Sequence, residues 1–325
     1  MALLEVDNLE VTFPTRRGKL HALRGVSLSL DAGERLGIVG ESGAGKSMAA
    51  FAILNLISEP GRISDGHIRF EGRDLATTSE DEIRAIRGDR ISMIFQDPMM
   101  TLNPVMTVGT QMVETLQAHR TISETDARDL SIAKLAEVQI PSPEARFDAY
   151  PHELSGGLRQ RVVIAIALLS DPAIIIADEP TTALDVTIQA EILALLLALC
   201  RDHDTALILI THDLAVVSQV TEQVMVMYAG RIVEAGPTRR IIDAPQHPYT
   251  RGLIAALPEQ NKPGQPLNQI PGSMPSLDNV PPGCAFSPRC TFADDLCRSD
   301  IPELNDPDHP GVACHHVERV AETSS

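Results

Sequence analysis

A glycine-rich segment, Gly40-Glu-Ser-Gly-Ala-Gly-Lys-Ser47, constrains the fold of this chain more than any other part of the sequence. It lies between an apolar stretch at 34–39 and a second one that ends at Leu56, so the order strand, loop, helix is predicted. The glycines let backbone N–H groups converge on phosphates, Lys46 adds a positive charge, and the Ser47 hydroxyl can ligate Mg²⁺. A glycine-rich turn without a ligand is the alternative interpretation.

Two adjacent acids, Asp178 and Glu179, close another apolar stretch at 173–177. Carboxylates at the end of a buried strand are costly unless they serve a cation or a reaction. We therefore predict that Asp178 helps to hold Mg²⁺ and that Glu179 polarises a water molecule. An exposed strand end with solvated acids is the alternative.

The arrangement of apolar stretches predicts an α/β fold. Near-continuous apolar runs lie at 91–95, 173–177 and 206–210. They alternate with helical segments such as 186–201, which is typical of a parallel sheet that is buried on both faces. Alternating patterns within 3–30 and at 68–70 predict an antiparallel β layer beside that sheet.

Two segments depart from this alternation. Between about 97 and 160 the pattern is helical, which predicts an inserted helical subdomain. Later, 13 of the 23 prolines lie from Pro245 to Pro310. We therefore expect a nucleotide-binding domain at 1–240, with the insert at about 97–160, and a C-terminal extension at 241–325.

The formal net charge of −17 disfavours nucleic acid and anionic lipid as partners, because both are held by clustered Lys and Arg. The longest apolar runs, at 162–169 and 192–200, fall short of the ~18–20 residues that a membrane-spanning helix needs. The first residues have no basic region followed by an apolar one. We expect a cytoplasmic protein that reaches a membrane only through a specific protein contact.

A third segment, Leu154-Ser-Gly-Gly-Leu-Arg-Gln-Arg-Val162, lies before the acidic strand and opens a predicted helix. It resembles the signature motif of the ABC ATPase family, and Gln96, Asp185 and His212 match that family in order and spacing. The resemblance covers about 1–236. It implies the ABC ATPase fold: a RecA-like, mainly parallel sheet, an antiparallel β subdomain and an inserted helical subdomain.

The resemblance also implies catalytic roles. Glu179 would orient or deprotonate water, with His212 and Gln96 as the other catalytic candidates. Mg²⁺ would be held by Ser47, Gln96 and Asp178. Because phosphoryl transfer has a loose transition state, these groups would act mainly by positioning and by compensating charge.

A larger set is expected to bind ATP. Phe13 matches the position that stacks on adenine, although a lone aromatic in a strand also fits a core residue. Ser155, Gly156 and Gly157 would close over the γ-phosphate held by a second subunit, so hydrolysis is expected to require a dimer. The predicted ATP-binding residues are Phe13, Gly40, Glu41, Ser42, Gly43, Ala44, Gly45, Lys46, Ser47, Gln96, Ser155, Gly156, Gly157, Asp178, Asp185 and His212.

Further segments are similar to the ATP-binding subunits of bacterial dipeptide and oligopeptide importers. They lie at 37–43, 94–104, 150–155, 179–189 and 247–250. This resemblance implies two membrane subunits, an extracytoplasmic peptide-binding protein and a second, non-identical ATPase. Met99, Met100 and Leu102 would offer an apolar socket to a membrane subunit, or are core residues. Importers of nickel or another small solute share most of these segments, and a soluble ABC ATPase is a further alternative.

Four of the five cysteines lie in the extension: Cys284, Cys290, Cys297 and Cys314. Their gaps of five, six and sixteen residues differ from the close pairs usual in zinc sites, although Zn²⁺ with His315 or His316 stays an alternative. The pattern resembles the C-terminal region of peptide-importer ATPases, for which a [4Fe-4S] cluster is implied. Four free thiols are the remaining alternative. Cys200 is predicted to be a small buried hydrophobe.

Overall fold

The structure is a computed structural model that describes residues 2–16, 18–182, 184–257, 268–304 and 310–322. The chain divides into two compact units. Unit 1 comprises 1–30, 35–77 and 209–325, and unit 2 comprises 31–34 and 78–208. Among the described residues, no helix combines the length and the apolar character needed to cross a bilayer.

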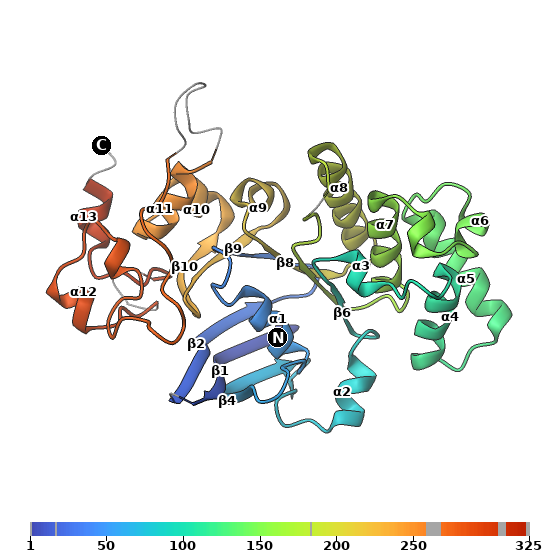
Figure 1. The fold of residues 1–325 in the computed structure, drawn as a ribbon, viewed down its shortest axis with the longest axis horizontal. Coiled ribbons are helices and arrows are strands. Elements are labelled where there is room, and N and C mark those ends of the chain that lie inside the picture. Colours follow the sequence, from blue (N-terminus) through green and yellow to red (C-terminus); the bar gives the residue numbers. More distant parts are fainter. Residues whose placement is uncertain (1, 17, 183, 258–267, 305–309, 323–325) are drawn as a thin grey trace. The chain divides into compact units, whose positions relative to one another are not determined.

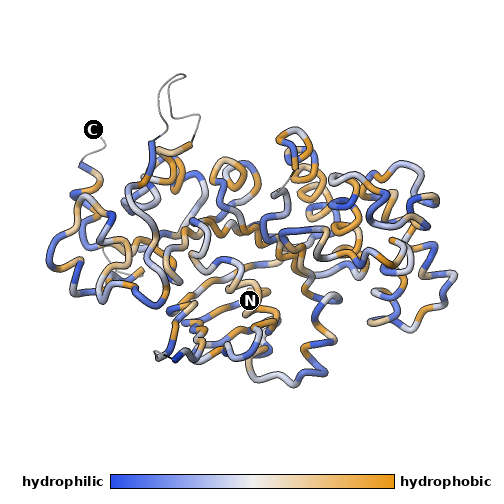
Figure 2. The backbone as a smooth tube through the Cα atoms, in the orientation of Figure 1, coloured by the Kyte–Doolittle hydropathy of each residue, from blue (hydrophilic) through white to orange (hydrophobic). Residues whose placement is uncertain are grey.

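The first sheet of unit 1 is antiparallel, with strand order β2-β1-β4-β5. Figure 1 shows β2, β1 and β4 side by side. Its strands are β1 (Leu4–Thr15), β2 (Gly18–Leu30), β4 (Arg62–Phe70) and β5 (Arg73–Asp74). Leu4 pairs with both Leu30 and Phe70, which sets the register of the three long strands. Hydrophobic and hydrophilic residues alternate along them (Figure 2), so one face is buried. The predicted antiparallel β layer is confirmed.

Unit 1 also contains the strand, loop and helix predicted around the glycine-rich segment. Strand β3 (Arg35–Val39) is followed by α1 (Lys46–Ile53). β3 pairs in parallel with β9 (Gln223–Tyr228), which pairs antiparallel with β10 (Arg231–Pro237). Two short helices accompany these strands, α9 (Leu214–Val220) and α10 (Thr238–Asp243).

Unit 2 contains a parallel strand pair and most of the helices. β6 (Ile91–Ile94) runs parallel to β7 (Ile174–Asp178), with Ile91 opposite Ile174, and both strands are largely buried. β8 (Ala206–Thr211) begins in unit 2 and ends in unit 1. The helices are α2 (Glu80–Ile86), α3 (Pro98–Thr101), α4 (Val108–His119), α5 (Glu124–Glu137), α6 (Pro143–Phe147), α7 (Gly156–Ala167) and α8 (Val186–Asp202), with a short 3₁₀ turn at Pro151–Glu153.

The C-terminal extension packs within unit 1. It contains α11 (Pro248–Ala255), a 3₁₀ turn at Ser287–Arg289, α12 (Asp295–Ser299) and α13 (Val317–Glu322). Its segment around Val312 pairs with the edge of β10: Ala313 N–H donates to Val233 O at 2.9 Å, and Ala235 N–H donates to Gly311 O at 2.8 Å. The proline-rich extension is therefore fastened to the strands of unit 1 by backbone hydrogen bonds.

A buried carboxylate, Glu234 of β10, ties the beginning of the extension to unit 1. Its side chain is 0% exposed. It accepts hydrogen bonds from the backbone N–H groups of Gln246 at 2.9 Å and His247 at 3.0 Å, and it pairs with Arg240 at 3.3 Å. His247 in turn caps α11, where its Nδ1 accepts the Tyr249 N–H at 3.1 Å. Burial lowers the pKa of His247 to about 3, so its ring is neutral and can accept.

Replacing Glu234 with Ala is expected to lower the free energy of unfolding by about 2–4 kcal/mol, because two backbone donors and the Arg240 guanidinium lose their acceptor. Denaturant unfolding of the purified chain measures this change. The control is Asp243→Ala, which removes an exposed pair with Arg239 and should change stability by less than ~1 kcal/mol. Equal losses in the two variants would contradict the anchoring role of Glu234.

Candidate active site

The glycine-rich loop between β3 and α1 is held tightly against other backbone of unit 1. A Cβ at Gly40 would lie 2.3 Å from the Met227 carbonyl oxygen of β9. Gly45 precedes α1 with φ 108°, a conformation that residues with a side chain rarely adopt. Lys46 is buried, and its Nζ donates to Gly40 O at 2.9 Å and Glu41 O at 3.1 Å. The loop leads directly into the N-terminus of α1 and carries the Lys46 ammonium, and this setting suits a phosphate ligand.

Phe13 and His212 also belong to unit 1. The half-buried ring of Phe13 packs against Gly61, where a Cβ would lie 2.3 Å from Phe13 Cε1. His212 follows β8 directly and is exposed. Asp213 caps α9 by accepting the Ala215 N–H at 2.8 Å, which fixes the turn that carries His212.

The predicted acids lie in unit 2 at the end of β7. Asp178 is the last residue of the strand and is buried. Glu179 follows with φ 47°, a left-handed conformation that is unusual for a residue with a side chain. Its Oε2 accepts from Thr182 Oγ1 at 2.9 Å and from Gln96 Nε2 at 3.3 Å. The structure thus brings together Gln96 and Glu179, which are 83 residues apart in the sequence.

The predicted signature segment forms the N-terminus of α7 in unit 2. Ser155 is exposed and caps the helix, since its Oγ accepts the Leu158 N–H at 3.4 Å. Gly156 and Gly157 are the first two residues of α7. Asp185 is the N-cap residue of α8. An exposed hydroxyl at a helix N-terminus has donors that suit an anion.

The proposed apolar socket is only partly available. Leu102 is 3% exposed and fits the alternative of a core residue. Met99 is 48% exposed, and its Sδ lies 3.0 Å from Arg159 Nη1. The Met100 side chain lies outside the part of the chain that the structure describes.

The four cysteines of the extension line one small cavity in unit 1. Backbone contacts bring their segments together, because Cys284 N–H donates to Cys297 O at 2.8 Å. The pKa of Cys284 is raised to about 11 and that of Cys314 to about 12, mainly by burial and also by the charge of the neighbouring cysteines. The five cysteines form no disulfide, and Cys200 is buried in α8 of unit 2.

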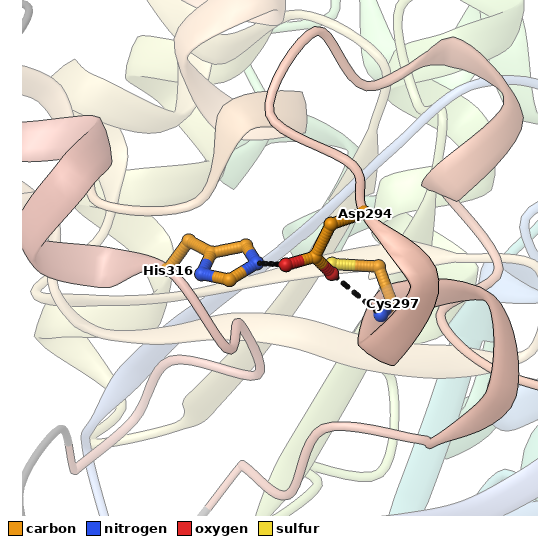
Figure 3. A group of neighbouring side chains, drawn as sticks. All are labelled: Asp294, Cys297 and His316. Carbon is orange, nitrogen blue, oxygen red and sulfur yellow. Dashed lines mark hydrogen bonds and ion pairs between the residues drawn. The ribbon is translucent and has the colours of Figure 1, made fainter.

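A second donor group, drawn in Figure 3, shares Cys297 and His316 with the lining of this cavity. Ligand atoms of Asp294, Cys297 and His316 lie within 4.8 Å of one another. His316 Nε2 is 2.9 Å from Asp294 Oδ2, while the other carboxylate oxygen accepts the Cys297 N–H at 3.1 Å. Asp294 was absent from the predicted ligand set.

Comparisons with known proteins show the family of this chain. A family model described as ABC transporter matches residues 23–182, and one described as oligopeptide/dipeptide transporter, C-terminal region, matches 233–297. The oligopeptide transport ATP-binding protein OppD of Escherichia coli (strain K12) is 49% identical over 93% of this chain and 89% of its own length. The dipeptide transport ATP-binding protein DppD of the same organism is 48% identical over 94% of this chain and 93% of its own length.

The chain belongs to the ABC family of oligopeptide and dipeptide transport ATP-binding proteins. A solved dimer of an ATP-binding cassette with ADP and phosphate has a TM-score of 0.65 and 28% identity, and it matches 73% of this chain and 99% of that one. The predicted ABC ATPase fold is therefore confirmed.

Sequence reasoning about this ABC ATPase missed two side chains that contact the phosphate loop. Arg289 and Tyr249 of the extension both bind Glu41. Tyr249 lies within the segment His247-Pro-Tyr-Thr250, and Arg289 directly precedes Cys290. Both therefore stood in segments that the resemblance had singled out, but nothing in their spacing related them to a loop more than 200 residues away.

Replacing Glu179 with Gln is expected to leave ATP affinity nearly unchanged and to lower the hydrolysis rate ~10²-fold or more, because the amide cannot accept a proton from water. Nucleotide binding and phosphate release by the assembled complex measure the two quantities. Glu144→Gln, at an exposed position of α6 in the same unit, is the matched control. Equal hydrolysis by the Glu179 variant and the control would exclude Glu179 as the catalytic base.

Proposed function

We propose that this chain is the ATP-hydrolysing motor subunit of an importer for dipeptides or oligopeptides. The observation that carries the proposal is that identity of 48–49% to oligopeptide and dipeptide transport ATP-binding proteins extends over 93–94% of the chain. It therefore includes the C-terminal region as well as the ABC segments. A family model for the C-terminal region of oligopeptide/dipeptide transporters adds support at 233–297.

The residues of unit 1 bind the nucleotide. The backbone N–H groups of the phosphate loop and Lys46 compensate the phosphate charges, and Phe13 offers a ring face to adenine. His212 contacts the γ-phosphate and the attacking water.

The residues of unit 2 prepare water for attack. Glu179 orients or deprotonates the water, and Thr182 and Gln96 hold its carboxylate by hydrogen bonds. Mg²⁺, when bound with ATP through Ser47, Gln96 and Asp178, would neutralise developing charge on the phosphates. The buried carboxylate of Asp178 and the polar side chains of Ser47 and Gln96 are the oxygen donors that Mg²⁺ prefers.

The N-terminus of α7 serves the ATP held by a second ATPase subunit. Its exposed Ser155 and the two glycines that follow can reach a phosphate from outside the chain. The solved relative with ADP and phosphate is itself described as a dimer. The second subunit is a non-identical ATPase, so two different chains complete each other's sites.

The remaining partners are two membrane subunits and an extracytoplasmic peptide-binding protein. The exposed Met99 in α3, beside Arg159, forms part of the contact with a membrane subunit. The chain thereby associates peripherally with the cytoplasmic face of the membrane. With a net charge of −17, this protein contact rather than lipid attraction holds it there.

Purification of the tagged chain from its native host in mild detergent tests this function. We expect two membrane proteins and a second ATPase to co-purify, and uptake of labelled dipeptides to fail when Glu179 is replaced with Gln. Recovery of ribosomes or DNA instead of membrane proteins would overturn the importer. If the Glu179→Gln variant kept peptide uptake but lost nickel uptake, the chain would instead belong to a nickel importer.

We infer further that the four-cysteine cavity holds a [4Fe-4S] cluster. The support is the donor set: four thiols, of which Cys297 lies in α12 and the others in irregular segments, line one small cavity. Cysteine thiolates are the ligands of such clusters. A bound cluster would add covalent cross-links to a segment rich in proline, so its role is to brace the extension. Asp294, Cys297 and His316 provide the donors for the alternative, a zinc ion.

Anaerobic purification followed by iron, sulfide and zinc analysis distinguishes these metals. We expect about four iron and four sulfide per chain with a brown colour, and loss of both in Cys290→Ser. The matched control is Cys200→Ser, which changes a cysteine of unit 2 and should keep the iron. A colourless protein with stoichiometric zinc would favour the zinc site, and absence of any metal would overturn both.

A further inference from the structure

The phosphate loop and the C-terminal extension meet at one residue of unit 1, Glu41. This residue follows Gly40 in the loop and uses three different groups for contacts. Its carbonyl accepts from Lys46 Nζ at 3.1 Å. Its N–H donates to the hydroxyl of Tyr249 at 2.8 Å, and its carboxylate binds Arg289. The N–H and the carboxylate both bind residues of the extension, so the extension takes part in setting the conformation of the loop.

The contact with Arg289 has the geometry of a strong ion pair. Arg289 Nη1 lies 2.9 Å from Glu41 Oε2, and Nη2 lies 3.1 Å from Oε1, so both carboxylate oxygens are bound. The side chain of Arg289 is 6% exposed and that of Glu41 is 28% exposed. Burial by itself would lower the pKa of Arg289, but the Glu41 carboxylate offsets this effect and raises it. The pair is therefore largely buried, and salt weakens it less than it weakens an exposed surface pair.

Aromatic residues of the extension and of β9 fix the position of Arg289. Its guanidinium lies 5.8 Å from the ring centres of Tyr228 and Phe286, and Nη1 donates to Tyr228 Oη at 3.3 Å. Tyr249 packs on the same rings, and its ring centre lies 4.6 Å from that of Tyr228 and 5.5 Å from that of Phe286. Both groups that bind Glu41 thus arise from one packed cluster, and little rotamer freedom is left to either.

The charge of Glu41 gives this arrangement a consequence for nucleotide binding. A carboxylate in a loop that accepts a triphosphate would repel the ligand unless it is neutralised. Arg289 supplies the neutralising charge, and Tyr249 holds the backbone of the same residue. Without the Arg289 or the Tyr249 side chain, the loop would become ordered only when the nucleotide binds. That ordering would consume part of the binding free energy and weaken the affinity.

We propose that Arg289 and Tyr249 are positioning residues for the phosphate loop, through which the C-terminal extension sets the affinity of this chain for ATP. The proposal rests on the proposed ATPase function but requires neither the importer nor the iron–sulfur cluster.

The cysteine cavity lies next to this contact. Phe286 lines the cavity and packs on Tyr228 and Tyr249, and Arg289 directly precedes Cys290. A substitution that loosens the packing around the cavity is therefore expected to shift Phe286 and Arg289, and through them the phosphate loop. The nucleotide affinity therefore depends on how well the extension is packed.

The test is the dissociation constant of a fluorescent ATP analogue with Mg²⁺, measured on the full-length purified chain. Arg289→Gln is expected to weaken binding roughly tenfold, because an unneutralised carboxylate stays in the loop. Arg289→Lys, which keeps the charge but not the two-point contact, should retain part of the affinity. Adding Glu41→Gln to Arg289→Gln should recover affinity relative to the single Arg289 variant, since the repelling charge is then gone.

Tyr249→Phe, which removes only the hydroxyl, should weaken binding severalfold and speed hydrogen exchange of the loop amides.

Arg239→Gln, an arginine of an exposed pair on α10, is the matched control and should bind like the wild type. In the assembled complex, the Arg289 variants should raise the KM for ATP more than they lower kcat. Wild-type affinity in Arg289→Gln with only a lower melting temperature would overturn the proposal and leave Arg289 a structural residue. Failure of the wild-type chain itself to bind ATP would instead refute the proposed ATPase function.

Discussion

The close approach of the phosphate loop to neighbouring backbone is the constraint on which the rest of unit 1 depends. Gly40 lies against the Met227 carbonyl, and a Cβ at Gly45 would come within 3.2 Å of the Ala22 carbonyl of β2. Gly230 N–H also donates to Ala44 O at 2.8 Å, which joins the loop to the turn between β9 and β10. The loop can therefore lie where β3 ends and α1 begins only because glycines occupy these positions. Backbone contacts within unit 1 thus restrain the shape of the loop, and catalysis by positioning depends on such restraint.

The extension adds a second set of restraints to the same loop. A segment with so many prolines cannot form regular ladders of hydrogen bonds by itself. It is instead fastened at separate points: the backbone pairing with β10, the buried Glu234 and the aromatic cluster around Phe286. The first two points lie on β10, which pairs with β9, and the third includes Tyr228 of β9. The Met227 carbonyl of β9 lies against Gly40 of the phosphate loop. Structural support for the extension and order in the nucleotide site are thus properties of one packed region.

Local patterns predicted much of the fold and of the site. The glycine-rich loop at 40–45, the apolar strand ending at Asp178 and the Ser-Gly-Gly segment that opens α7 each lie where the sequence placed them. Strand periodicity and helix capping act over short distances, so a local pattern can predict them. Long-range contacts could not be predicted in this way. The pairing of Glu41 with Arg289 joins residues 248 positions apart, and in the sequence neither residue differs from the many charged residues that lie on a surface. Leu102 likewise has the apolar character of a docking residue, and only its burial assigns it to the core.

The strand pairing between 311–313 and β10 has a consequence for the tendency of this chain to aggregate. β10 is the outer strand of its sheet, and an uncovered outer strand offers a row of backbone donors and acceptors to any passing chain. The extension occupies part of that row, with Val233 O and the Ala235 N–H both engaged. A chain cut before the extension would keep its phosphate loop and its acids but would present a template for strand addition. The same segment that braces the nucleotide site therefore also protects the sheet against self-association.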